Sequence, residues 1–226
     1  MTTREDRLTA LAALAEPLRR DLYLRVAASP EAMSRDAAAG AVGVSRSVAA
    51  FHLDKLAEVG LLEVEYRRPP GRGGPGAGRP AKHYRLADDE VAFTVPERHY
   101  DLAASILARA VADAQEHGVP VDDALCAAAR GCGRAIGARV AAPAGVRARA
   151  RVVDALAANG YEPRVEGEKV TLENCPFHAL AEQQRALVCG MNLEVVGGVL
   201  EGAGATDMTA RLDPAPGRCC VTVSGR

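Results

Sequence analysis

The chain has 226 residues, of which 48% are hydrophobic and 25% charged, and its net charge is −1. This balance is typical of an ordinary globular protein and excludes disordered and collagen-like chains. The first residues, MTTREDRLTALAAL, carry charges from the fourth position, so we expect no signal peptide, and no apolar run is long enough to span a membrane. We therefore expect a cytoplasmic protein with no membrane association. Its six cysteines should serve metal binding or redox chemistry rather than disulfides.

The small net charge conceals an uneven distribution. Residues 1–87 contain 14 basic and 10 acidic side chains, a balance of +4, whereas residues 88–226 contain 14 and 19, a balance of −5. From Arg67 to Arg85 there are six basic residues and no acidic one. A basic segment of this kind is expected where a protein contacts phosphate groups.

Three helices are predicted in the first third of the chain. One follows Pro17 and ends near residue 29, and two shorter ones at 34–42 and 45–58 each begin on a serine, a good N-cap. Gly43 separates the last two, which gives a helix, a tight turn and a second helix. The helix at 45–58 is expected to bury Val48, together with leucines farther along the same face.

A basic β-hairpin is predicted after these helices. LLEVEYRR alternates apolar and polar residues, and a loop rich in glycine and arginine, PPGRGGPGAGRPAK, separates it from HYRLA. A helix-turn-helix followed by such a hairpin is a winged helix, in which the second helix reads base edges and the wing contacts the DNA backbone or the minor groove. The predicted DNA contacts are Ser45, Arg46, Ser47, Phe51, Lys55, Arg67, Arg68, Arg72, Arg79 and Lys82. The alternative is a helix-turn-helix that serves only in packing or protein contact.

Two longer helices are predicted in the middle of the chain. The amphipathic helix at 98–116 either joins the two subunits of a dimer or covers the core of its own domain. The helix at 121–141 contains Cys126 and Cys132, which point to different faces of the helix. We expect both to be small buried residues rather than metal ligands.

The last third predicts a small domain with the element order α-β-β-α-β-β. A helix at 146–158 precedes the strands YEPRV and EKVTLE, and a helix at 184–200 precedes the strands TARLD and CCVTVSG. The expected fold class is therefore α+β. The expected parts are a winged helix at 1–90, a helical linker and dimerisation region at 91–145, and an α+β sensor domain at 146–226.

Four cysteines of the last third come from three separate elements: Cys175, Cys189, Cys219 and Cys220. They can meet only in the folded domain, unlike the closely spaced pairs of a zinc knuckle, and they predict a thiolate site for a metal or an iron–sulfur cluster. Because neighbours on a strand face opposite sides, only one of Cys219 and Cys220 is expected to reach the site. His178 is the rival for the fourth ligand position.

Other interpretations of these cysteines remain open. They are alternatively buried core residues, zinc ligands, a reversible thiol switch, or bystanders in a domain that binds a small organic ligand. An enzyme with Cys175 as nucleophile and His178 as base is disfavoured, because the sequence identifies no carboxylate to orient the histidine. We therefore expect a binding protein rather than an enzyme.

Two sets of segments carry a family resemblance. VGVSRSVAAFHLDKLAEVGLLEV at 42–64 and GRPAKHYRLA at 78–87 resemble the bacterial ArsR-like winged-helix repressors, and NCPFHALA, LVCGMNL and RLDPAPGRCCV resemble the SufR-like branch, the iron–sulfur-sensing repressors of the suf operon. The resemblance implies a homodimeric repressor that binds operator DNA. It also implies a [4Fe–4S] cluster held by Cys175, Cys189 and one of Cys219 or Cys220. The last interval is long and its cysteine is doubled, which departs from the pattern of that branch.

Overall fold

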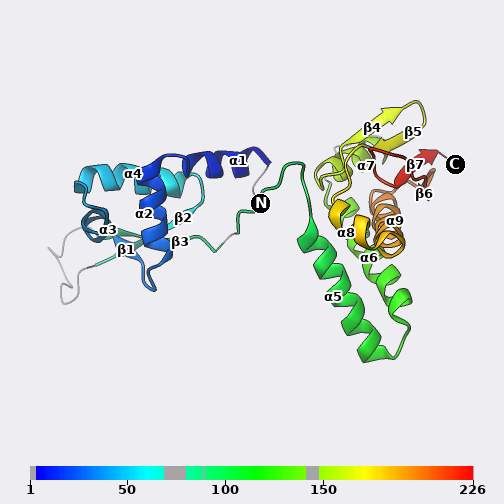
Figure 1. The fold of residues 1–226 in the computed structure, drawn as a ribbon, viewed down its shortest axis with the longest axis horizontal. Coiled ribbons are helices and arrows are strands. Elements are labelled where there is room, and N and C mark those ends of the chain that lie inside the picture. Colours follow the sequence, from blue (N-terminus) through cyan, green and yellow to red (C-terminus); the bar gives the residue numbers. More distant parts are fainter. Residues whose placement is uncertain (1–3, 69–79, 89, 141–147, 226) are drawn as a thin grey trace. The chain divides into compact units, whose positions relative to one another are not determined.

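The structure is a computed structural model that describes residues 4–68, 80–88, 90–140 and 148–225. The chain divides into two compact units, Met1–Phe93 and Thr94–Arg226, and each is described by itself (Figure 1). Both units combine helices with a small antiparallel sheet, which confirms the predicted α+β class. Within the described ranges, no helix is both long enough and apolar enough to span a membrane.

The first unit packs helices against a three-stranded antiparallel sheet of order β1-β3-β2. Its described elements are α1 (Arg4–Ala13), α2 (Pro17–Ala27), β1 (Met33–Ser34), α3 (Arg35–Val42), α4 (Arg46–Glu58), β2 (Leu62–Arg67) and β3 (Ala81–Leu86). The predicted helices and hairpin are present, whereas α1 and β1 were not predicted. Leu22, Leu53, Leu56 and Tyr84 are fully buried and form the centre of the core.

Short-range interactions place the two helices of the helix-turn-helix. The hydroxyl of Ser34 accepts a hydrogen bond from the amide of Ala37 at 3.1 Å, and that of Ser45 accepts one from the amide of Val48 at 3.3 Å. Gly43 ends α3 with a φ of 72°, a conformation that favours glycine. Caps of this kind are encoded by neighbouring residues, which is why the boundaries of these helices could be predicted.

The second unit is built around a central helix, α9 (Arg185–Gly202). Its other described elements are α5 (Tyr100–His117), α6 (Val121–Arg139), α7 (Ala148–Ala157), β4 (Pro163–Glu166), β5 (Lys169–Leu172), α8 (His178–Gln183), β6 (Met208–Leu212) and β7 (Val221–Gly225). The antiparallel sheet has the order β4-β5-β7-β6. One core lies between α9, α7 and the sheet, and another lies between α9, α5 and α6.

The second unit therefore also includes helices that the sequence assigned to a separate linker at 91–145. Ala103, Ile106 and Ala110 of α5 are buried against α6 and α9, so this face of α5 covers the core of its own unit. The boundary expected after residue 90 lies close to the division after Phe93.

Helices α6 and α9 approach closely along a line of glycines. A Cβ on Gly133 would overlap the carbonyl oxygen of Val195, and a Cβ on Gly198 would overlap the carbonyl oxygen of Arg130. Any larger residue at these positions would force the two helices apart. The close distance between α6 and α9 therefore depends on glycine at these positions.

The prediction that both cysteines of α6 are buried is wrong for Cys126. Cys126 is exposed, whereas Cys132 is half-buried and packs against both cores. Leu125 and Ala129, four residues apart, occupy the buried stripe instead. Cys126 lies beside this stripe and faces solvent.

Candidate functional site

The second helix of the helix-turn-helix, α4, presents a partly apolar face to solvent. The side chain of Phe51 is 66% exposed and that of Val48 is 39% exposed. The prediction that Val48 faces the core is wrong, because Ala49, Leu53 and Leu56 take the buried positions. The outer face of α4 is therefore available for contact.

The predicted polar contacts on α4 are exposed and weakly held. Arg46 Nε lies 2.9 Å from Asp36 Oδ1, and Lys55 Nζ lies 2.8 Å from Glu58 Oε2. The hydroxyl of Ser47 lies 3.0 Å from that of the capping serine. Exposed ion pairs contribute about 0–1 kcal/mol, so phosphate groups can compete for both cations.

Asp54 connects α4 to the wing. Its carboxylate accepts hydrogen bonds from Lys82 Nζ at 2.8 Å, from the Tyr84 hydroxyl at 2.7 Å and from Arg35 at 2.7 Å. Burial and the bond to Asp54 raise the pKa of Tyr84 to about 12, so its hydroxyl stays protonated. Sequence reasoning missed Arg35, Asp54 and Tyr84, and it assigned Lys82 to DNA, whereas the structure places its ammonium on Asp54.

The basic wing is partly neutralised across the hairpin. Arg85 of β3 forms ion pairs with Glu63 and with Glu65 of β2, the latter at 3.2 Å, and with Asp88 at 2.7 Å. In the hairpin register Glu63 lies directly opposite Arg85. The segment from Arg67 to Arg85 contains no acidic residue, but the wing is less positive than this suggests. Strand pairing places glutamates of β2 beside Arg85.

The structure describes only some of the other residues predicted to contact DNA from the wing. Arg67 lies 2.8 Å from Glu65, and Arg68 is exposed. Arg72 and Arg79 lie outside the described residues. Among the described arginines of the wing, Arg68 is thus exposed and has no ion pair with another described residue.

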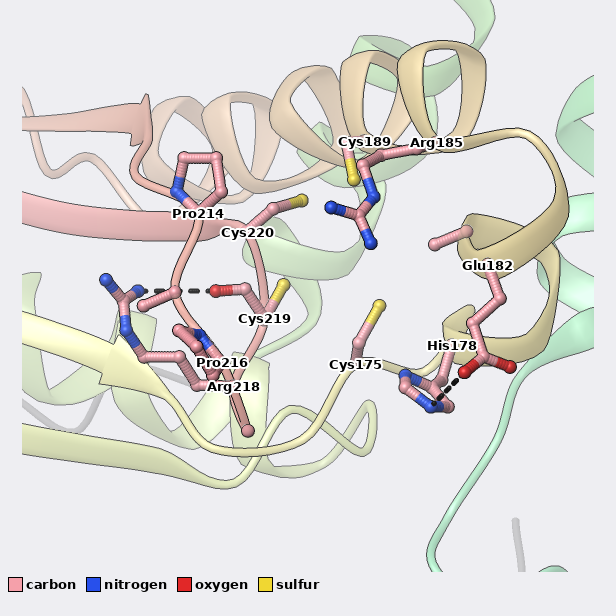
Figure 2. Close-up of a pocket in the computed structure, with 13 residues that line it drawn as sticks. Cys175, His178, Glu182, Arg185, Cys189, Pro214, Pro216, Arg218, Cys219 and Cys220 are labelled. Atoms are coloured by element: carbon pink, nitrogen blue, oxygen red, sulfur yellow. Dashed lines mark hydrogen bonds and ion pairs between the residues drawn. The ribbon is translucent and has the colours of Figure 1, made fainter.

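In the second unit, four cysteines line one cavity of about 470 Å³: Cys175, Cys189, Cys219 and Cys220. Figure 2 shows their sulfur atoms directed toward a common space. Cys175 lies between β5 and α8, Cys189 lies in the second turn of α9, and the other two lie just before β7. Folding thus brings together thiols that are up to 45 residues apart in the sequence.

The expectation that only one of Cys219 and Cys220 reaches the site is wrong. Both line the cavity. The strand β7 begins at Val221, so the two cysteines lie in the turn before it and do not follow the alternation of a strand. Gly217, with a φ of 76°, lies in the same turn. This turn supplies the fourth thiol that the sequence did not identify.

Buried polar contacts hold the segment that carries Cys175. The side-chain amide of Asn174 donates to the carbonyl of Glu97 at 2.8 Å, and Arg98 donates to the Asn174 side chain and to the carbonyl of Cys175, the latter at 3.3 Å. Asn174 is buried. These contacts join the beginning of the second unit to the cavity, and sequence reasoning missed them because the partners are more than 70 residues apart.

The pKa values of two cavity thiols are raised. The hydrogen bond with Cys219, together with burial, raises the pKa of Cys175. For Cys219 the bond with Cys175 lowers the pKa, but the bond with Cys220 and burial outweigh it and raise the pKa to about 11. Both side chains are thiols at neutral pH, so binding a metal through them releases protons.

The donor set of the cavity is rich in sulfur. Cys219 forms side-chain hydrogen bonds with Cys175 and with Cys220, so these three sulfurs lie in contact in pairs. Across the described ranges, the set of three potential ligands with donor atoms all within 4.8 Å is Asp113, Glu116 and His117, which contains no cysteine. Thiolates are ligands of zinc and of iron–sulfur clusters alike, so the donor set is compatible with either.

His178 lies at the edge of the same cavity. Its side chain is 56% exposed, and its Nε2 lies 3.4 Å from Glu182 Oε1. Glu182 is the carboxylate that the sequence did not identify beside a possible Cys175 and His178 pair. The raised pKa of Cys175 is the opposite of what an activated nucleophile needs, so this pair does not resemble an activated cysteine and its base.

Comparison with known proteins gives a family match within the first unit. The profile of a family described as a helix-turn-helix domain matches residues 14–65, which run through α2, α3 and α4 into β2. No curated protein and no solved structure matches the chain. The family match supports a DNA-binding regulator that carries its helix-turn-helix in the first unit.

Proposed function

We propose that the chain is a transcriptional repressor whose binding to operator DNA is controlled by an iron–sulfur cluster held by Cys175, Cys189, Cys219 and Cys220. The observation that carries the proposal is the convergence of four thiols on one cavity in a chain that also carries a helix-turn-helix. A bound [4Fe–4S] cluster would be lost on oxidation or when iron is scarce, so its presence would report both conditions to the protein. The resemblance to SufR-like repressors supports the same function.

Cations around the cavity favour an anionic cluster. Arg185 directs its guanidinium into the cavity, and Arg218 lines it while donating to the carbonyl of Cys219 at 3.3 Å (Figure 2). Arg98 lowers the pKa of Cys175 through its charge, although burial and hydrogen bonding outweigh this effect. A cluster with four thiolate ligands is negatively charged, and Arg185 would stabilise that charge, whereas the guanidinium of Arg218 is already paired with Asp213 at 2.9 Å.

In this proposal, a homodimer of the chain binds DNA in the cytoplasm. In dimeric helix-turn-helix proteins the recognition helices contact half-sites about 34 Å apart. Here Arg46, Ser47 and Phe51 of α4 would contact bases, and the arginines of the wing would contact phosphates. Gain or loss of the cluster would change how the winged helices are presented. A coupling of about 1–3 kcal/mol would change operator affinity roughly 5- to 150-fold.

The cluster is tested by purification without oxygen. We expect equal amounts of iron and sulfide, a broad visible absorption, and loss of both on replacing Cys175, Cys189 or Cys219 by serine. Cys126→Ser is the matched control, because Cys126 is exposed on α6 and does not line the cavity. Zinc alone, or no metal after reconstitution with iron and sulfide, would contradict the proposal and favour a zinc site, a thiol switch or an organic ligand.

Control of DNA binding is tested separately. Duplexes selected by the protein from a random pool serve as the probe, and fluorescence anisotropy gives the affinity with and without the cluster. We expect a 5- to 150-fold difference in the wild type and none in Cys189→Ser. If the loaded and stripped wild type bind these duplexes equally, the cluster does not control DNA binding.

A further inference from the structure

A chain of three buried side chains runs behind the cysteine cavity. The hydroxyl of Tyr161 donates to Asn192 Oδ1 at 2.6 Å, and Asn192 Nδ2 donates to Cys219 Sγ at 3.1 Å. Asn192 is fully buried, and the exposed fractions of Tyr161 and Cys219 are 1% each. Because none of these groups reaches water, each hydrogen bond replaces lost solvation.

The Asn192 amide presents its NH₂ group to the sulfur. The Tyr161 hydroxyl donates to the oxygen of the same amide, and this bond supports the orientation in which the NH₂ group is directed toward Cys219. The reverse orientation would place the amide oxygen against the sulfur. An oxygen there would suit a protonated thiol but would repel a thiolate.

A backbone hydrogen bond also holds the residue that carries this sulfur. The amide of Cys219 donates to the carbonyl of Leu172 at 2.8 Å, which ties the cysteine to β5. Asn192 lies three residues after Cys189 on α9, so one face of this helix supplies both a cavity thiol and a donor to a second one. Cys219 is therefore held through its backbone by β5 and through its sulfur by α9.

We propose that Asn192 is a positioning residue that stabilises Cys219 as a cluster ligand and raises the reduction potential of the cluster. The inference rests on the proposed function. A hydrogen bond from nitrogen to a neutral thiol is weak, and it becomes stronger when the sulfur carries negative charge in a metal-bound thiolate. Reduction adds charge to the cluster and its sulfurs, so the same donor favours the reduced state.

The test compares Asn192→Leu with Tyr161→Phe and Val152→Ala in the full chain. Leucine has the branched shape of asparagine and the same number of side-chain heavy atoms but no donor, and Tyr161→Phe keeps the amide while removing the hydroxyl that bonds its oxygen. Val152 is fully buried in the same core, so Val152→Ala controls for a loss of packing that leaves the Cys219 contact intact. The readouts are the reduction potential by anaerobic titration, the rate of cluster loss in air and the melting temperature.

We expect Asn192→Leu to shift the reduction potential to more negative values and to speed cluster loss several-fold, and Tyr161→Phe to shift both in the same direction by less. Val152→Ala should lower the melting temperature without shifting the potential. The proposal is overturned if Asn192→Leu has the wild-type potential, or if Val152→Ala shifts it equally, and in both cases the proposed function stands. Wild-type protein that takes up no iron and sulfide overturns the proposed function itself, before any variant is compared.

Discussion

The carboxylate of Asp54 on α4 accepts a hydrogen bond from Lys82 of β3 at 2.8 Å, which ties the recognition helix to the base of the wing. The same carboxylate accepts bonds from Tyr84 and Arg35, so three donors from two other elements meet on one side chain. The two surfaces expected to contact DNA are therefore held in a fixed relation within the first unit. Lys82 contributes to this relation whether or not it also contacts phosphate.

Replacing Asp54 by alanine should destabilise the first unit. The variant loses three hydrogen bonds, two of them to charged donors, and we expect the free energy of unfolding to fall by about 1–3 kcal/mol. Glu58→Ala is the matched control, because Glu58 makes an exposed ion pair with Lys55 on the same helix and should change stability by less than about 0.5 kcal/mol. Chemical denaturation measures both, and equal effects would show that Asp54 is not a structural junction.

The same junction predicts a pH dependence. Burial raises the pKa of Asp54, but hydrogen bonds from Lys82, Tyr84 and Arg35 outweigh it and hold the pKa below its usual value of about 4. The pKa is thus lower in the folded state, so its contribution to stability is present above about pH 4 and is lost as the pH falls through the folded pKa. The difference in melting temperature between wild type and Asp54→Asn should therefore shrink toward low pH. A difference that stays constant would contradict this assignment.

The glycines between α6 and α9 give a prediction for the second unit. In Gly133→Ala the new methyl group would overlap the backbone of Val195, so the helices must separate and we expect a loss of about 1–3 kcal/mol in the free energy of unfolding. Gly131 lies on the same helix, and a Cβ there would have Arg134 at 3.9 Å as its nearest neighbour. Because alanine favours helix over glycine, Gly131→Ala should be neutral or stabilising by up to about 1 kcal/mol. A similar loss in both variants would show that close packing is not the cause.

Features encoded by neighbouring residues could be predicted from the sequence. The serine caps of α3 and α4, the turn at Gly43 and the strand β2 depend on a few adjacent positions, and all are present. The assignment of Val48 to the core failed because three helical residues in a row, Val48, Ala49 and Ala50, are small or apolar. Only packing against the other helices decides which of them is buried.

Features that depend on contacts distant in the sequence could not be predicted. The doubled cysteine contributes two thiols because β7 begins one residue after it, and that boundary is set by pairing with β6. The amide of Asn192 meets Tyr161 and Cys219 only after three segments have packed together. The sequence indicated that Cys175, Cys189 and one cysteine of the doubled pair converge, whereas the fourth thiol and the groups that support these cysteines were not visible in it.

We expect the exposed ring of Phe51 on α4 to contribute to the recognition of one DNA sequence over another. Its side chain is 66% exposed, and the ring of His52 contacts it edge-on with centroids 5.2 Å apart. A phenyl ring in water leaves a large apolar area uncovered. In the major groove, the apolar group that such a ring can cover is the methyl group of thymine.

Replacing thymine by uracil removes this methyl group and leaves base pairing intact. On duplexes selected by the protein, uracil at the contacted position should weaken wild-type binding about fourfold, since burying one methyl group contributes about 0.8 kcal/mol. Phe51→Ala should bind the thymine duplex more weakly and respond no further to uracil. Val111→Ala, which removes an exposed apolar side chain from α5, should keep the wild-type response. Uracil sensitivity that persists in Phe51→Ala would assign the methyl contact to another residue.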